Sequence, residues 1–117
     1  MQSDKQLFIH EIKGDVLEIR LQGEIDHHSA VSVRADIDSL IFEHRPKKTV
    51  LDLSSISFMD SSGLGLIMGR YSLMKELSGS LSLRAPTHAV MKILSLAGME
   101  KIIGIENKGK ENSNEKK

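Results

Sequence analysis

The sequence predicts a single α/β domain. Strand-like and helix-like stretches alternate along most of the 117 residues, and apolar and charged contents of 39% and 27% are near globular averages. The expected order is β-β-α-β-α-β-α-β, which implies a largely parallel sheet with right-handed crossovers. A chain of this length can bury one core but is too short for two domains.

The first half of the chain predicts a hairpin followed by a helix. Strands are expected at residues 7–12 and 16–21, and the turn residues Lys13-Gly14-Asp15 separate them. Asp26 is a candidate N-cap, since its carboxylate can accept a hydrogen bond from the first helical turn. Pro46 ends this helix. The apolar residues at helical spacing are Ala30, Val33, Ile37, Leu40 and Ile41.

The second half predicts three strands and two helices. Apolar or alternating runs place the strands at residues 49–53, 80–84 and 101–106, the first of them central. One helix is expected from Ser61 to about Leu77, with Gly79 as its C-terminal signal. Pro86 suits the first position of the other helix, which ends at Gly98. Residues 1–106 should therefore form the folded body.

The last eleven residues, 107–117, form a polar, charged segment with nothing to bury, which is typical of a solvated tail. A binding arm is the alternative, but mixed charge argues against it. The polar start of the chain lacks a signal-peptide core, and no run approaches the roughly 20 apolar residues of a membrane span. We therefore expect a soluble, cytoplasmic protein that has no membrane contact.

Composition excludes several classes of function. Sixteen basic residues balance sixteen acidic ones, so nothing in the charge favours nucleic acid as a partner. Aromatic residues make up only 3%, which argues against a base-stacking platform. Without cysteine there is no disulfide or thiolate–zinc site, and the histidines lack a known metal-ligand spacing. No phosphate loop or dinucleotide fingerprint is present, so neither metal nor cofactor is expected.

The most informative stretch is Asp60-Ser61-Ser62-Gly63, where an apolar run meets a helical pattern. A helix N-terminus with free hydroxyls is a place where a phosphate can be held. We expect Ser61 to be the N-cap and Ser62 to occupy the first helical position with its hydroxyl free. The plainer interpretation is that both serines only cap the helix. A catalytic serine is disfavoured, because the glycine that begins a Gly-x-Ser-x-Gly elbow is missing.

Two strand-to-helix junctions of the chain should lie close together in the fold. Asp26 and the Asp60–Ser62 segment each follow a strand and each begin a helix. Parallel neighbouring strands end at the same edge of a sheet, which is where α/β proteins usually bind ligands. Asp26 is therefore an expected neighbour of Ser62.

The helix after Ser62 has an apolar arc of roughly 220°, wider than one-sided packing on a sheet requires. One strip runs through Leu64, Ile67, Met68, Tyr71 and Met74, and a second through Leu66, Leu73 and Leu77, with Arg70 beside it. Either neighbouring helices or a partner protein could cover the second strip. Gly65 and Gly69, one turn apart, either allow another backbone to approach closely or mark a bare surface.

These motifs resemble a known family. The segments Gly23-Glu24-Ile25-Asp26-His27-His28 and Phe58-Met59-Asp60-Ser61-Ser62-Gly63-Leu64-Gly65, followed by Met68-Gly69-Arg70-Tyr71, are similar to the STAS domain. Within that family they look like the bacterial anti-sigma factor antagonists, and most like the sporulation members. The resemblance covers about residues 5–106.

The resemblance implies a small mixed, mostly parallel sheet with helices packed mainly on one side. It also implies a regulator rather than an enzyme. In such proteins the unphosphorylated form binds an anti-sigma factor that is also a serine kinase, which releases a sigma factor. Phosphorylation of the serine matching Ser62 ends this binding, and a metal-dependent serine phosphatase restores it. The alternatives are a general stress-response switch, a small-molecule-binding STAS sensor and, less favoured, a hydrolase using Ser62.

The resemblance further implies which residues meet the partner. They are Asp26, His27, His28, Asp60, Ser61, Ser62, Gly63, Leu64, Gly65 and Gly69.

Overall fold

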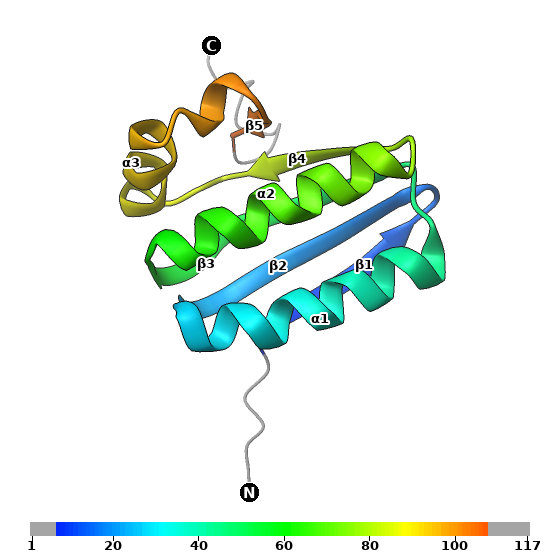
Figure 1. Cartoon of the computed structure of the whole chain (residues 1–117), viewed down its shortest axis with the longest axis horizontal. Coiled ribbons are helices and arrows are strands. Elements are labelled where there is room, and N and C mark those ends of the chain that lie inside the picture. Colours follow the sequence, from blue (N-terminus) through cyan, green and yellow to red (C-terminus); the bar gives the residue numbers. More distant parts are fainter. Residues whose placement is uncertain (1–6, 108–117) are drawn as a thin grey trace, which may run out of the picture.

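The computed structural model describes residues 7–107, which form one five-stranded sheet with three α-helices (Figure 1). The residues 1–6 and most of the expected tail, 108–117, lie outside the described part. The elements are β1 Phe8–Lys13, β2 Val16–Ile25, α1 His27–His44, β3 Lys48–Met59, α2 Ser61–Glu76, β4 Ser80–Arg84, α3 His88–Leu96, the 3-10 helix η1 Met99–Lys101 and β5 Gly104–Glu106.

The strands lie in their sequence order, β1-β2-β3-β4-β5. β1 pairs with β2 antiparallel, as the hairpin prediction requires, and the remaining pairs are parallel. β3 is the central strand, as expected. The predicted mixed, mostly parallel sheet is therefore confirmed.

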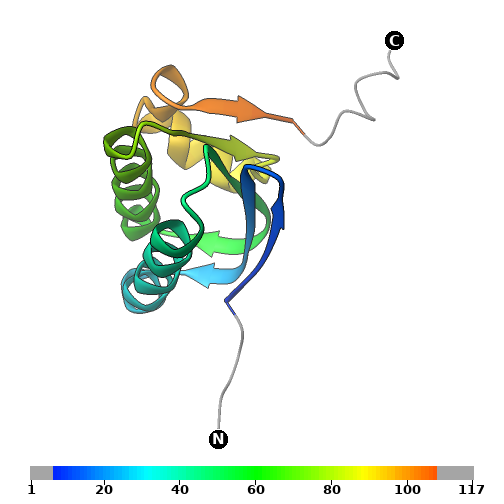
Figure 2. The same cartoon turned by 90° about the vertical axis from the view of Figure 1, so that its right-hand side faces the viewer.

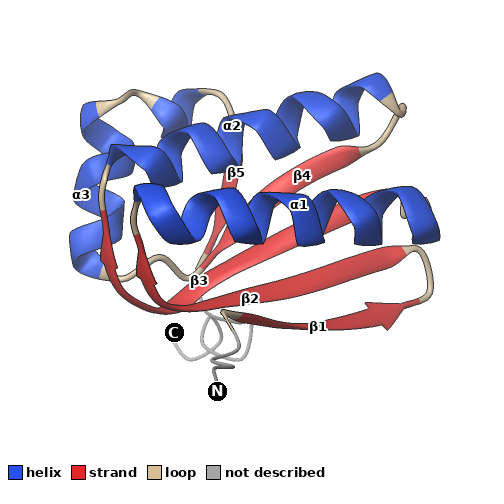
Figure 3. Cartoon of the chain, turned by 60° about the horizontal axis from the view of Figure 1, so that its bottom comes forward, coloured by secondary structure: helices blue, strands red, loops and turns tan. Residues whose placement is uncertain are grey.

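Helices α1 and α2 lie side by side on one face of the sheet, while α3 lies beyond the ends of the long strands (Figures 2 and 3). The core fills the space between these two helices and the sheet. Because α1 repeats apolar residues every three or four positions, it buries Val33, Ile37 and Ile41 completely. Opposite them lie inward-facing strand residues such as Leu17, Ile19, Leu51 and Leu53.

The longest strands extend further than the sequence pattern indicated. β2 continues from residue 21 to Ile25, and β3 continues from residue 53 to Met59. Polar residues interrupt the apolar pattern at Gln22 in β2 and at Ser54 in β3. The pairing of the two strands shifts register between Arg20 and Gln22 and again between Gly23 and Glu24. Backbone pairing between the two neighbours carries both strands through these interruptions, so they end at one edge.

Two predicted boundaries near α3 are wrong. Thr87 caps α3, its side chain accepting a hydrogen bond from the Val90 N–H, so Pro86 precedes the cap and is not the first helical residue. The last strand begins only at Gly104, because residues 99–101 form the 3-10 helix. A hydroxyl N-cap satisfies an orphan N–H that a proline cannot.

Gly79 lies just after α2, as predicted, but it does not adopt the left-handed backbone conformation that a glycine often takes after a helix. Ser78 has the positive φ of 66°, and the Gly79 N–H donates to the Met74 carbonyl at 2.7 Å. A Cβ on Gly79 would lie 2.9 Å from the Lys47 carbonyl oxygen. The glycine therefore permits close backbone approach at the end of the helix.

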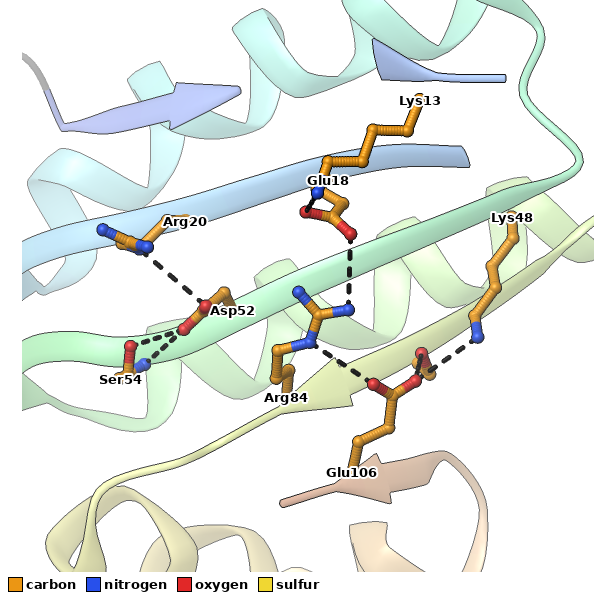
Figure 4. A network of polar contacts seen from close by, with 9 residues as sticks. Lys13, Glu18, Arg20, Lys48, Asp52, Ser54, Arg84 and Glu106 are labelled. Atoms are coloured by element: carbon orange, nitrogen blue, oxygen red, sulfur yellow. Dashed lines mark hydrogen bonds and ion pairs between the residues drawn. The ribbon is translucent and has the colours of Figure 1, made fainter. Parts of the chain in front are cut away.

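The face of the sheet opposite α1 and α2 carries charged side chains (Figure 4). Arg20, Asp52, Arg84 and Glu106 occupy one row across four neighbouring strands, with alternating charge. Ion pairs link Arg20 to Asp52 and Arg84 to Glu106, at 3.8 Å and 3.3 Å. Among the described helices, none combines the length and apolar character that a bilayer crossing demands.

Candidate functional site

The two strand–helix junctions meet at one edge of the sheet, as predicted. The last residues of β2 and β3, Ile25 and Met59, are paired in register. Immediately beyond them, the Asp60 N–H donates to the Ile25 carbonyl at 3.2 Å. The N-termini of α1 and α2 therefore begin next to each other (Figure 1).

Asp26 caps α1 through a reciprocal pair of hydrogen bonds. The Ser29 N–H donates to the Asp26 carboxylate at 2.9 Å, and the Asp26 N–H donates to Ser29 Oγ at 3.0 Å. Ser29 Oγ also donates to the Glu24 carbonyl at 2.9 Å. The Ser29 N–H is the largest influence holding the pKa of Asp26 below its ordinary value. Asp26 is therefore a fixed, ionised carboxylate beside the second junction.

Asp60, and not Ser61, is the N-cap of α2. Its carboxylate accepts the Ser62 N–H at 2.8 Å, and α2 begins at Ser61. A carboxylate is a stronger acceptor than a hydroxyl and complements the helix dipole, so the cap falls one residue earlier than predicted. Ser61 is then the exposed first residue of the helix and Ser62 its half-buried second residue.

The hydroxyls of Ser61 and Ser62 make no hydrogen bond to any other described residue. The expectation of a free Ser62 hydroxyl therefore agrees with the structure, although Asp60 rather than Ser61 performs the capping. Burial separates the two serines, since Ser61 is exposed and Ser62 is half-buried.

Ser62 lies in an open groove between the N-terminal halves of α1 and α2, with a volume of about 500 Å³. The residues lining this α1–α2 groove are His27, Ala30, Val31 and Arg34 from α1 and Ser62, Gly65, Leu66, Gly69 and Arg70 from α2. A Cβ added to Gly65 or Gly69 would meet nothing within 4 Å. The two glycines thus leave the wall of the groove bare, one of the two interpretations of their spacing.

One of the residues that line the groove, Arg70, is buried and forms an ion pair with the half-buried Asp38. Arg70 is only 7% exposed, and its Nε lies 2.8 Å from Oδ1 of Asp38 on α1. One of its terminal nitrogens donates to the Leu66 carbonyl at 3.3 Å. Burial lowers the pKa of Arg70, Asp38 opposes that shift, and the nearby positive charge of Arg34 adds to it.

Sequence reasoning did not identify Arg34, Asp38 or Arg70 as parts of this groove. The available signal was the position of Arg70 next to an apolar strip of its helix. Both apolar strips of α2 contribute buried side chains, Ile67 and Met74 from the first and Leu66 from the second. Because α2 packs against the sheet and against α1 together, this agrees with the alternative that a neighbouring helix covers the second strip.

The two histidines of the expected site line different hollows. His27 lines the α1–α2 groove, whereas His28 lines a separate hollow of about 680 Å³ with Asp26, Ser29 and other residues of the β2–α1 region. The two adjacent histidines therefore point to different sides of the start of α1. Within the described residues, no cluster of three or more histidine, aspartate or glutamate side chains is placed to hold a metal ion.

Gly63 and Leu64 complete the set on α2. A Cβ on Gly63 would overlap Met59 Cγ and lie 2.5 Å from its sulfur. Gly63 is therefore required for packing the start of α2 on the end of β3. Leu64 is half-buried and packs against the core.

The comparisons with known proteins agree with this geometry. The model of the STAS domain matches residues 8–112. An anti-sigma F factor antagonist of Paenibacillus polymyxa is 40% identical over 90 residues, which are 77% of each chain. The structure of the anti-sigma factor antagonist SpoIIAA in its unphosphorylated form matches with a TM-score of 0.77 and 31% identity, covering 91% of each chain. The phosphorylated form of Bacillus SpoIIAA matches with a TM-score of 0.71 and 30% identity, covering 91% of this chain and 95% of that one.

The fold and the paired junctions thus define a small α/β domain with two unbonded serine hydroxyls at a helix start, one exposed and one half-buried. The chain belongs to the STAS domain family. Its relatives within that family are anti-sigma factor antagonists, which are regulatory proteins.

Proposed function

We propose that this protein is an anti-sigma factor antagonist controlled by phosphorylation of Ser62. In its unphosphorylated form it binds an anti-sigma factor that is also a serine kinase, and so releases a sporulation sigma factor. The kinase then phosphorylates Ser62 and ends the binding, and a metal-dependent serine phosphatase reverses the modification. The protein itself performs no catalysis in this cycle.

One observation carries the choice of Ser62. Its hydroxyl makes no hydrogen bond within the described part of the chain, and it lies in an open groove at the edge where both helices start. Ser61 is adjacent and equally unbonded, but it lies outside the set of residues that line the groove. A partner bound across this edge would therefore enclose Ser62.

The proposed partner surface consists of residues from both junctions and the groove. It comprises Asp26, His27, His28, Asp60, Ser61, Ser62, Gly63, Leu64, Gly65 and Gly69. Similarity to the anti-sigma F factor antagonist of Paenibacillus polymyxa supports the choice of an anti-sigma factor as the partner.

A phosphate at Ser62 would act locally. It carries about −1.5 to −2 charges at neutral pH. The carboxylate of Asp60 already accepts the Ser62 N–H, so the phosphate would add charge beside an existing anion. Removing that charge from water in an interface costs on the order of several kcal/mol, and each 1.4 kcal/mol is about tenfold in affinity. The fold itself can remain unchanged, since the chain resembles both the phosphorylated and unphosphorylated SpoIIAA structures.

The proposal is tested by mixing the purified protein with candidate anti-sigma kinases and either ADP or ATP. With ADP we expect a stable complex by size-exclusion chromatography, and with ATP a phosphate on Ser62 by mass spectrometry. Ser62→Ala should bind without being phosphorylated, and Ser62→Asp should bind poorly. Ser61→Ala is the matched control and should behave like the parent protein.

Phosphate found on Ser61 in the parent protein would contradict the assignment. Complex formation only with stress-response kinases would replace the sporulation role by the stress-response alternative. Tight binding of a nucleotide by the isolated protein, with no response to any kinase, would instead support a small-molecule-binding STAS sensor.

A further inference from the structure

The α1–α2 groove carries an unbalanced positive charge next to Ser62. Arg34 lines the groove and forms no ion pair with any carboxylate of the described residues. Arg70 is nearby, but its charge is already paired with Asp38 at 2.8 Å. His27 also lines the groove and is exposed.

The positions along the two helices bring these cations toward Ser62. Both helices follow parallel strands and start at the same edge, so they run in the same direction. His27 and Ser62 both belong to a first turn. Arg34 lies seven residues after His27, about 10 Å further along α1. Because helical side chains tilt toward the N-terminus, an extended Arg34 side chain can reach back along the groove toward Ser62, which lines the same groove.

The helix N-terminus is a poor alternative place for a phosphate on Ser62. The Ser62 N–H already donates to the Asp60 carboxylate, and the Gly63 N–H donates to the Asp60 carbonyl at 2.9 Å, so neither donor is available to a phosphate. Asp26, the other carboxylate at this edge, is held ionised by its own cap. Both anions repel a phosphate, whereas the positive charge of Arg34 in the groove attracts it.

We propose that the phosphate of phosphorylated Ser62 lies in the α1–α2 groove and is held there by His27 and Arg34. This rests on the proposed function for the identity of the modified residue. A guanidinium suits this role because it presents several donors to phosphate oxygens.

The experiment places phosphoserine at position 62 during translation, so that no kinase is needed. The second ionisation of the phosphate is then followed by ³¹P NMR against pH, in the parent protein and in Arg34→Gln. Loss of Arg34 should raise the second pKa of the phosphate by about one unit, since a neighbouring positive charge favours the dianion. Arg34→Lys should keep most of the parent value.

Arg20→Gln is the matched control, because Arg20 pairs with Asp52 on the other face of the sheet and should leave the phosphate unchanged. In the same samples, phosphorylation should perturb the imidazole NMR signals of His27 more than those of His28, which lines a different hollow. Far-ultraviolet circular dichroism checks that each variant is folded.

The proposal is overturned if Arg34→Gln shifts the phosphate pKa no more than Arg20→Gln does. Because the phosphoserine is installed directly, this titration is independent of the kinase. If no kinase modifies Ser62, the proposed function is wrong, but the titration still tests whether the groove holds the phosphate.

Discussion

Arg84 on β4 and Glu18 on β2 form an ion pair of 3.4 Å that passes over the strand between them, β3 (Figure 4). The residue of β3 in register with Glu18 is Val50, which is only 1% exposed. No described helix covers this face of the sheet (Figure 3). The charged side chains on either side therefore shield Val50 from water.

Arg84→Ala should destabilise the protein by about 1–2 kcal/mol, measured by urea unfolding. The change removes ion pairs to Glu18 and Glu106 together and uncovers apolar surface of Val50. Arg20→Ala is the control, since Arg20 is half-exposed and its pair with Asp52 is long, at 3.8 Å. The Arg20→Ala variant should lose about 0.5 kcal/mol or less of unfolding free energy. Equal losses in the two variants would show that no shielding of Val50 is involved.

The stability contributed by Glu106 should depend on pH. Burial opposes ionisation of Glu106, but hydrogen bonds and charge from Lys48 and Arg84 outweigh it, so its pKa lies below the ordinary 4.5. The folded state then binds this proton less tightly than the unfolded state. The contribution is therefore present above pH 4.5 and lost as the pH falls through the lower, folded pKa.

Glu106→Gln is accordingly expected to lower the free energy of unfolding at neutral pH by no more than about 1 kcal/mol, because Glu106 is 37% exposed. The difference from the parent protein should shrink as the pH falls below 4.5. Urea unfolding of both proteins across this range measures it. A difference that grows on acidification would contradict the assigned sign.

The sequence was sufficient for the order of elements, the hairpin, the central strand and the shared edge of Asp26 and Asp60. These features depend on local pattern and on the rules of parallel sheets. The cap of α2 was misplaced because Asp60 and Ser61 are both good N-cap residues, and the stronger acceptor, the Asp60 carboxylate, takes the role. The groove with Arg34 and Arg70 could not be predicted, since it depends on the rotation of α2 against α1.

Two glycines of α2 should respond oppositely to alanine. In Gly63→Ala the new methyl group would overlap Met59, which is almost fully buried, so we expect a loss of about 1–3 kcal/mol. In Gly65→Ala it would meet no atom within 4 Å, so the better helix propensity should stabilise the protein by about 0.5–1 kcal/mol. Thermal and urea unfolding measure both effects.

The same pair separates folding from partner binding. Gly65→Ala should weaken binding to the kinase while leaving the protein folded, because the proposed partner approaches the groove at this bare position. Gly63→Ala should affect both. Undiminished kinase binding by Gly65→Ala would remove Gly65 from the proposed partner surface.

In the ion pair of buried Arg70 with half-buried Asp38, losing the carboxylate should destabilise the protein more than losing the guanidinium. Asp38→Asn leaves the guanidinium buried without its counter-charge, so we expect a loss of about 2 kcal/mol. Arg70→Met removes the buried charge and keeps an apolar side chain against α1, so it should cost about 1 kcal/mol or less. Because the two residues are in contact, the double variant should lose less than the sum of the single losses.

Asp36→Asn, at an exposed position of the same helix, controls for helix propensity. Urea unfolding of all four variants decides the question, and an Asp38→Asn loss no larger than that of Asp36→Asn would mean that Arg70 is solvated without its partner.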